Sequence, residues 1–223
     1  MRTSELNPWW SVVSAITSVL MRAFFRIKVE GVSNVPAEGP AILAFNHVSV
    51  LDGPALGIEV ARRRKRESRF LVAAELFRTP VTGWILRSFD QIPIRRGEGD
   101  VDALREAVRT VSSGAIAALA PEGTVNHDGA TELLRIRRGV SRLALATTAP
   151  VIPVGIWGTQ RRWSKSGRHY GRPWRPRLAF VFGEALVPQG DPAEQDDIDA
   201  FTQRVREGIE AQVERARDVA GPA

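Results

Sequence analysis

The stretch Ala41-Ile42-Leu43-Ala44-Phe45-Asn46-His47-Val48-Ser49-Val50-Leu51-Asp52 decides the fold. Its first five residues are an uninterrupted apolar run, which is typical of a short strand buried inside a parallel sheet. A helix then begins at Asp52-Gly53-Pro54, because Asp is a preferred N-cap and Pro is tolerated in a first helical turn. A strand, a polar turn and a helix in this order predict an α/β architecture.

The same alternation continues along the rest of the chain. Apolar runs predict further strands at 69–73, 91–94, 115–119, 151–156 and 178–182. Between and after them, helices are expected at 75–88, 100–113, 140–148 and 198–219. Pro93 indicates that its strand lies at an edge or an end of the sheet. We therefore expect a central, largely parallel mixed sheet covered by helices on both faces.

Composition limits the possible functions. The 223 residues are 43% hydrophobic and 25% charged, which fits one packed α/β domain with at most a small appendage. The sequence contains no cysteine, so disulfides, thiolate catalysis and Cys-based metal sites are excluded. With only three histidines, a His-rich metal site is not expected either.

An excess of basic residues points to an anionic partner. Lys and Arg number 31 against 25 Asp and Glu, for a net charge of +6. Nucleic acid, a phospholipid surface and a phosphorylated small molecule all satisfy this charge. The run at 62–66 is purely cationic, and a solvated loop is its simplest interpretation. The segment 161–177 interleaves Arg with Trp and Tyr, which suits lipid headgroups, a nucleotide moiety such as that of coenzyme A, or single-stranded nucleic acid.

The N-terminal segment has the character of an interfacial helix. Residues 9–21 are uncharged, but this stretch is shorter than the roughly 20 residues that a membrane span needs. Tandem Trp and Phe pairs with flanking Arg suit a helix lying in a membrane interface. The alternative is a helix packed on the protein's own core. We divide the chain into a membrane-associating helical segment, 1–29, and an α/β domain, 30–223.

His47 and Asp52 are the candidate catalytic pair. His47 follows the buried strand at its carboxyl end, where open α/β sheets place their ligands. A sharp turn into the next helix can fold the Asp52 carboxylate back onto the imidazole. That contact would fix the tautomer and leave the other ring nitrogen to accept a hydroxyl proton. The alternative is a polar histidine in a solvated loop next to an ordinary helix cap.

Four blocks of sequence resemble one enzyme family. Asn46-His47-x4-Asp52 is similar to the N-H-x4-D motif of the 1-acylglycerol-3-phosphate acyltransferases, within the glycerolipid acyltransferases. Residues 91–97 resemble the second block, with Arg96 as its arginine, Pro121-Glu122-Gly123-Thr124 the third, and 149–154 the fourth. The blocks occur in the family's order, and the similarity covers roughly residues 30 to 190.

The resemblance implies a reaction. His47, oriented by Asp52, would deprotonate the hydroxyl of 1-acylglycerol-3-phosphate, and this oxygen would attack an acyl-CoA or acyl carrier protein thioester to give phosphatidic acid. No metal or other cofactor is implied. Substrate-binding roles would fall to the remaining motif residues, Asn46, Arg96, Glu122, Gly123 and Thr124. An enzyme with such substrates is expected to be a peripheral or monotopic membrane protein at the cytoplasmic face.

Departures from the family pattern keep two alternatives open. The family usually has Lys, Gly, Phe and Arg-Ser at four places where this sequence has, respectively, Ala73, Asp90, Ala120 and Val125-Asn126. With fewer cations for a phosphate, the same chemistry on another lysolipid or glycolipid acceptor stays possible. A more remote alternative is a non-enzymatic basic protein that binds lipid or nucleic acid. No helix-turn-helix or aromatic RNA-binding signature occurs, so nucleic acid is not an expected partner.

Overall fold

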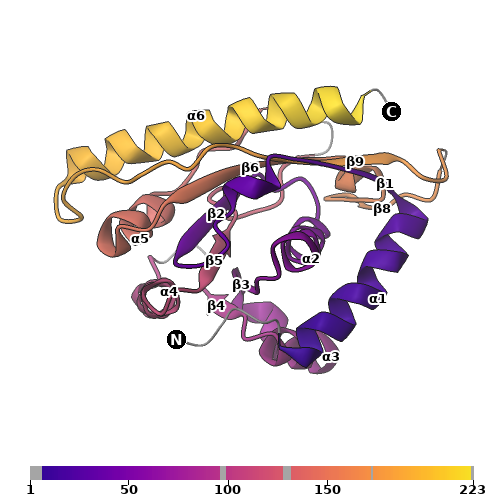
Figure 1. The fold of residues 1–223 in the computed structure, drawn as a ribbon, viewed down its shortest axis with the longest axis horizontal. Helices are drawn as coiled ribbons and strands as arrows, with labels where there is room; N and C mark the ends of the chain where they lie inside the picture. The colour runs from indigo at the N-terminus through magenta and orange to yellow at the C-terminus, as the bar shows by residue number, and fades with distance from the viewer. Residues whose placement is uncertain (1–6, 96–98, 128–131, 172, 222–223) are drawn as a thin grey trace.

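The computed structural model describes residues 7–95, 99–127, 132–171 and 173–221 (Figure 1). Its α-helices are α1 Pro8–Phe24, α2 Asp52–Arg64, α3 Pro80–Ser88, α4 Val101–Ser112, α5 Gly139–Thr147 and α6 Gln195–Ala220. Its strands are β1 Arg26–Glu30, β2 Ala41–Phe45, β3 Ser68–Ala73, β4 Ile92–Ile94, β5 Ile116–Leu119, β6 Val151–Trp157, β7 Trp163–Ser164, β8 Gly167–Arg168 and β9 Arg177–Phe182. Short 3-10 turns occupy Val32–Asn34, Ala74–Arg78 and Thr159–Arg161.

The central sheet has the expected largely parallel topology. Within the described residues, seven strands form it in the order β1-β9-β6-β2-β5-β3-β4. All neighbouring pairs are parallel except β6 and β9. Leu43 of β2 lies level with Ala118 of β5 on one side and Ile152 of β6 on the other. β4 is the last strand of the order, as Pro93 predicted.

Helices cover both faces of this sheet, which explains the unbroken apolar sequence of β2. Ile42 and Ala44 face a cluster that includes side chains of α4, α5 and α6. Leu43 and Phe45 point to the opposite face, where α2 and the end of α1 pack (Figure 1). Successive residues of a strand face opposite sides, so a strand covered on both sides needs an apolar residue at every position.

The sheet begins earlier in the chain than expected. β1 pairs in parallel with β9, with Arg26 opposite Arg177, so the proposed division between residues 29 and 30 falls inside a strand. Only α1 precedes the sheet among the described residues. The sequence did not reveal β1 because an edge strand is covered less completely, and Arg26-Ile27-Lys28-Val29-Glu30 alternates charged with apolar residues.

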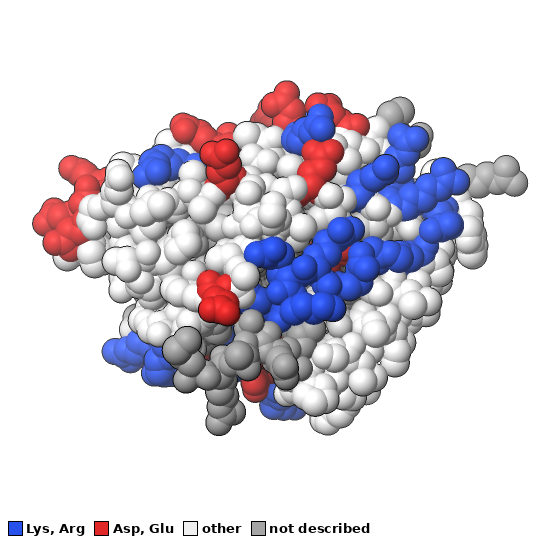
Figure 2. Space-filling model, in the orientation of Figure 1, with Lys and Arg blue, Asp and Glu red and all other residues white. Residues whose placement is uncertain are grey.

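The cationic run 62–66 is not a solvated loop. Arg62 and Arg63 lie in the last turn of α2 and form ion pairs with the buried Glu59, at 3.8 and 2.8 Å. Arg66 is itself buried and donates hydrogen bonds to the backbone carbonyls of Pro36 and Gly114. Figure 2 shows Lys and Arg side chains in a continuous band beside the uncharged surface that covers α1.

Candidate active site

The turn between β2 and α2 brings the imidazole and the carboxylate together as the sequence predicted. His47 Nδ1 lies 3.0 Å from Asp52 Oδ2. The Asp52 side chain is fully buried, whereas the His47 side chain keeps 18% of its surface exposed. A buried carboxylate therefore holds an imidazole that solvent and small molecules still reach.

Backbone groups fix the Asp52 carboxylate in this position. Its Oδ2 atom also accepts hydrogen bonds from the N–H groups of Val48 and Ser49, both at 2.8 Å. An ionised carboxylate accepts hydrogen bonds and donates none, so the proton between the two side chains belongs on His47 Nδ1. This tautomer leaves the lone pair of Nε2 available to take a proton from a hydroxyl group.

A threonine from the other half of the chain completes the contacts of Asp52. Thr159, fully buried, donates from Oγ1 to Asp52 Oδ1 at 2.5 Å. It directly follows Gly158, whose φ of 117° belongs to a conformation that favours glycine. Thr159 was not expected in the site from the sequence, because it is 107 positions from Asp52. A Gly-Thr pair just after the fourth-block strand is the signal that was available.

Asn46 braces the strands under the site. Its side-chain amide donates to the carbonyl of Ile156 at 3.0 Å and accepts from the N–H of the same residue at 2.7 Å. The residue is buried, and these two bonds tie the end of β2 to β6. Asn46 was expected to bind substrate. The structure instead places its amide on the backbone of a neighbouring strand.

Glu122 braces the backbone of His47. Its Oε1 atom accepts the N–H of His47 at 2.7 Å, and its Oε2 atom accepts the N–H of Leu134 at 3.0 Å. Burial raises the pKa of this carboxyl group, while the two backbone hydrogen bonds act in the opposite direction. Expected to bind substrate, Glu122 has both oxygens engaged with backbone groups.

The rest of the third block wraps around the same histidine. The N–H of Asn126 donates to the carbonyl of His47 at 2.7 Å. Between these two anchors lie Gly123, with a φ of 71°, and the half-buried Thr124. The hydrogen bonds of Glu122 and Asn126 thus hold the third block against the turn that carries His47. Arg96, the arginine of the second block, lies outside the described residues.

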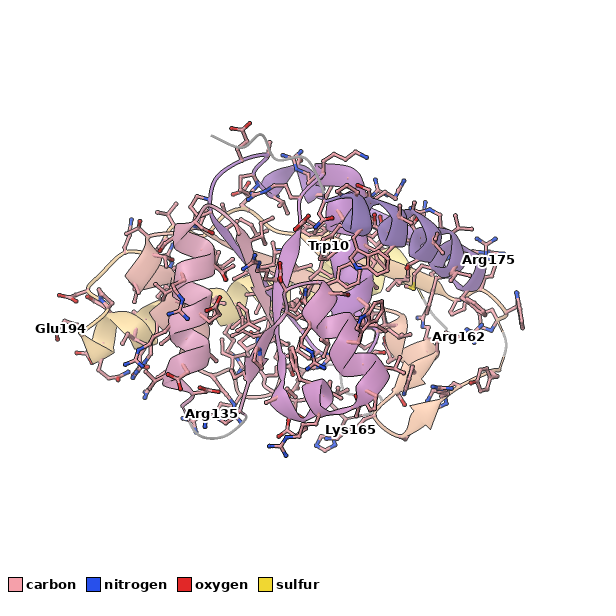
Figure 3. All side chains as sticks on the ribbon, turned by 90° about the horizontal axis from the view of Figure 1, so that it is seen from below. Trp10, Arg135, Arg162, Lys165, Arg175 and Glu194 are labelled. Carbon is pink, nitrogen blue, oxygen red and sulfur yellow. The ribbon has the colours of Figure 1, made fainter. Side chains whose placement is uncertain are left out.

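Arginines at 161–177 donate hydrogen bonds to backbone carbonyls of this loop and of its neighbour α1. Arg162 donates hydrogen bonds to the carbonyls of Gly171, Pro173 and Trp174. Arg175 donates to the carbonyl of Arg22 and so links this loop to the end of α1, where Figure 3 shows it. The hairpin of β7 and β8 was not expected from the sequence, since its strands have two residues each.

An apolar surface lies on α1 and α3. The inward side of α1 buries Trp10, Ser14 and Ser18, so small polar groups face the protein. Its outward side exposes large apolar side chains, and α3 adds others, with Trp9 and Trp84 in edge contact at 5.9 Å. We call this set the α1–α3 surface: Val12, Ile16, Val19, Leu20, Phe24, Val81, Trp84 and Ile85.

Comparisons with known proteins identify similar chains. The model of a protein family described as Acyltransferase matches residues 26–157. The chloroplastic 1-acyl-sn-glycerol-3-phosphate acyltransferase LPAT1 of Arabidopsis thaliana is 28% identical over 145 residues, which are 64% of this chain and 39% of that protein. The 1-acyl-sn-glycerol-3-phosphate acyltransferase alpha of Mus musculus is 30% identical over 183 residues, covering 78% and 61% of the two chains.

A solved structure shares the fold. The 1-acyl-sn-glycerophosphate acyltransferase PlsC of Thermotoga maritima superposes with a TM-score of 0.74 at 25% identity, over 96% of this chain and 81% of that one. By contrast, the chain spans only about two fifths of the length of the plant relatives it matches.

Proposed function

Because this chain belongs to the acyltransferase family, we propose that it moves a fatty acyl group from an acyl thioester to the free hydroxyl of a lysophospholipid. The acceptor that the relatives favour is 1-acylglycerol-3-phosphate, and the product is then phosphatidic acid. The observation that carries the proposal is the 3.0 Å contact between His47 Nδ1 and the buried Asp52. It leaves Nε2 of a partly exposed imidazole as the proton acceptor.

The reaction follows from that proton position. As Nε2 of His47 takes the hydroxyl proton, the acceptor oxygen bonds to the thioester carbonyl carbon. When the carbon–sulfur bond breaks, the imidazolium returns the proton to the leaving thiolate of coenzyme A or acyl carrier protein. Asp52 stabilises the transient positive charge on the ring. A positioned general base contributes roughly 10²- to 10⁴-fold, and holding the two substrates together contributes more.

We further propose that the α1–α3 surface docks the enzyme on the cytoplasmic face of a membrane. Val19 and Ile16 expose 68% and 59% of their surface, although both are large apolar residues. Covering such a contiguous patch with lipid removes apolar area from water. Across the described ranges, no helix is both long and apolar enough to cross a bilayer. The proposal therefore describes a helix that lies within the interface.

A product assay tests the acyl transfer. The purified protein is incubated with a mixture of acyl-CoA chain lengths and a panel of lysolipids, and products are identified by mass spectrometry. We expect phosphatidic acid as the main product. A preference for another lysolipid or a glycolipid keeps the chemistry and changes the acceptor. Absence of any acylated product, with carrier-protein donors also tried, contradicts the proposed function.

A His47→Ala variant tests whether His47 is the base. The side chain is partly exposed and lies at the start of the turn after β2, so its removal leaves no core cavity. We expect at least a 10²-fold loss of turnover with an unchanged melting temperature. A folded variant with turnover close to that of the wild type would reject His47 as the base.

A further inference from the structure

The side chain of Arg137 covers the backbone of Gly123. A Cβ atom added at Gly123 would lie 2.8 Å from Nε of Arg137 and 3.4 Å from its Cδ and Cζ atoms. The guanidinium group thus occupies the space beside a glycine whose neighbour Glu122 holds the N–H of His47. It lies against the third-block turn, whose Glu122 and Asn126 are hydrogen-bonded to the backbone of His47.

The backbone fixes where Arg137 stands. Its N–H donates to the carbonyl of Pro121 at 2.8 Å, and the preceding residue, Ile136, is buried in the core. Arg137 itself is exposed. A backbone held by a hydrogen bond and an accessible side chain suit a binding residue, because the guanidinium group is positioned before its ligand arrives.

Its side-chain donors have no partner among the described residues. In the part of the chain that the structure describes, the Arg137 guanidinium has no hydrogen-bond or ion-pair partner, whereas the neighbouring Arg138 pairs with Asp199. The adjacent carboxylate, Glu122, has both oxygens on backbone N–H groups. A guanidinium whose N–H donors have no partner among the described residues can donate to the oxygens of a phosphate or carboxylate.

We propose that Arg137 recognises the phosphate group of the acyl acceptor. The inference rests on the proposed function, because it takes His47 as the base that deprotonates the acceptor hydroxyl. In 1-acylglycerol-3-phosphate that hydroxyl and the phosphate ester are on adjacent glycerol carbons, so a cation for the phosphate must stand close to the base. The phosphates of acyl-CoA are separated from its thioester by the long pantetheine arm, and this distance favours the acceptor as the ligand.

The turn itself contains no Lys or Arg between residues 120 and 127. Arg137, ten positions beyond this turn, therefore brings a cation to a turn that lacks one. Its planar fork can bind two phosphate oxygens at once, which a lysine cannot do.

The test compares Arg137→Gln with wild type on two acceptors that differ in charge, lysophosphatidic acid and 1-monoacylglycerol. We expect the KM for lysophosphatidic acid to rise roughly 10- to 100-fold, as for a lost hydrogen bond to a charged group. The kcat at saturation, the KM for acyl-CoA and any turnover of monoacylglycerol should stay close to wild type. Arg137→Lys should recover part of the loss, because it keeps the charge without the fork.

The matched control is Arg204→Gln, which removes one exposed cation of the same type from α6 and should change none of these values. Binding of lysophosphatidic acid micelles, measured by isothermal titration, runs in parallel and requires no catalysis. An unchanged KM and affinity for lysophosphatidic acid in Arg137→Gln would overturn the inference. So would a rise confined to the KM for acyl-CoA, or an equal loss on both acceptors. A wild-type protein that binds this lipid through Arg137 but never acylates it would reject the proposed function alone.

Discussion

We call the turn between β2 and α2, together with Asp52 and Glu122, the catalytic turn. The catalytic turn and the α1–α3 surface both depart from the usual distribution of apolar residues inside and polar residues outside, in opposite directions. Around His47, charged and polar side chains such as Asp52 and Glu122 are buried, and each is held by backbone N–H groups. On α1, serines face the protein while Ile16 and Val19 face outward. Burying polar groups costs free energy unless they are hydrogen-bonded, and a large exposed apolar patch marks a binding surface.

From this difference we expect acyl transfer and membrane docking to depend on separate regions of this protein. The catalytic turn is a connected hydrogen-bond network, so a change in one member is transmitted to the imidazole. The α1–α3 surface depends on summed apolar area, so single changes there are small and roughly additive. Variants of the two regions should therefore fail in different assays.

The largest effect is expected for Asp52→Asn. An asparagine amide can direct its N–H at His47 Nδ1 and so favour the wrong tautomer of the ring. We expect kcat to fall roughly 10³- to 10⁴-fold, as for the analogous change in a serine-protease triad. Steady-state kinetics with a short-chain, monomeric acceptor measure this loss away from any membrane. Equal rates for variant and wild type would separate Asp52 from the chemistry, provided that melting curves show both folded.

A smaller effect in the same network is expected for Thr159→Val. Valine has a similar shape but cannot donate to Asp52 Oδ1, which leaves a buried carboxylate oxygen without its hydrogen bond. Such a loss costs about 1–3 kcal/mol, and we expect kcat to fall roughly tenfold with little change in KM. Thr159→Ser keeps the hydroxyl and should restore kcat. If Val and Ser variants behave alike, the hydroxyl contributes only packing.

The α1–α3 surface is tested by replacing Ile16 and Val19 with serine. Fully burying one such side chain contributes roughly 1.5–3 kcal/mol, so we expect vesicle binding to weaken at least tenfold. Turnover of a monomeric acceptor should not change. The control is Val101→Ser, which removes a valine that is also more than half exposed from α4, away from this surface (Figure 1). Cosedimentation with vesicles that is unaffected by the double change would contradict the docking role.

The smallest effect is expected for Asp100→Asn, outside both regions. The backbone N–H of Arg95, followed by its side chain, lowers the pKa of Asp100 from 3.8 to about 2. A carboxyl group with a lowered pKa stabilises the fold above its unfolded pKa, and this stability is lost as pH falls through the folded value. The variant should melt about 2–4 °C lower at neutral pH.

Its difference from wild type should shrink between pH 4 and pH 2. Melting temperatures across that range test the sign, and a difference that grows toward acid pH would contradict it. Acyl transfer at neutral pH should be unaffected, which separates this carboxyl group from the one at position 52.

The sequence predicted the fold where the pattern depends on neighbours along the chain. The strand at 41–45 was recognisable, because a strand buried on both faces must be apolar throughout. The helix does begin at Asp52, but its N-cap position is Leu51, and the Asp52 carboxylate contacts His47 and the preceding turn instead of capping the helix. β1 was missed because alternating charges at a sheet edge resemble an exposed segment. The roles of Arg62, Arg63 and Arg66 depend on partners elsewhere in the fold, and a charge run alone does not reveal them.

In the candidate site too, a contact between residues close in sequence was predictable, whereas contacts between distant residues were not. The contact between His47 and Asp52 was predictable, since five positions and one sharp turn join them. Thr159 reaches Asp52 from a segment 107 positions away, so only the fold brings it there. Residue type was also insufficient to separate a side chain that faces substrate from one, such as Asn46, that holds a backbone.

The most direct test of the account is the protonation of one imidazole. Replacing His127 and His169 with glutamine leaves His47 as the only histidine, so nitrogen NMR of the ring has a single assignable signal set. At a pH where the ring is neutral, we predict that the proton resides on Nδ1, toward Asp52, and that Nε2 is unprotonated. A proton found on Nε2 would contradict the account, because that nitrogen would then have no lone pair with which to activate an alcohol.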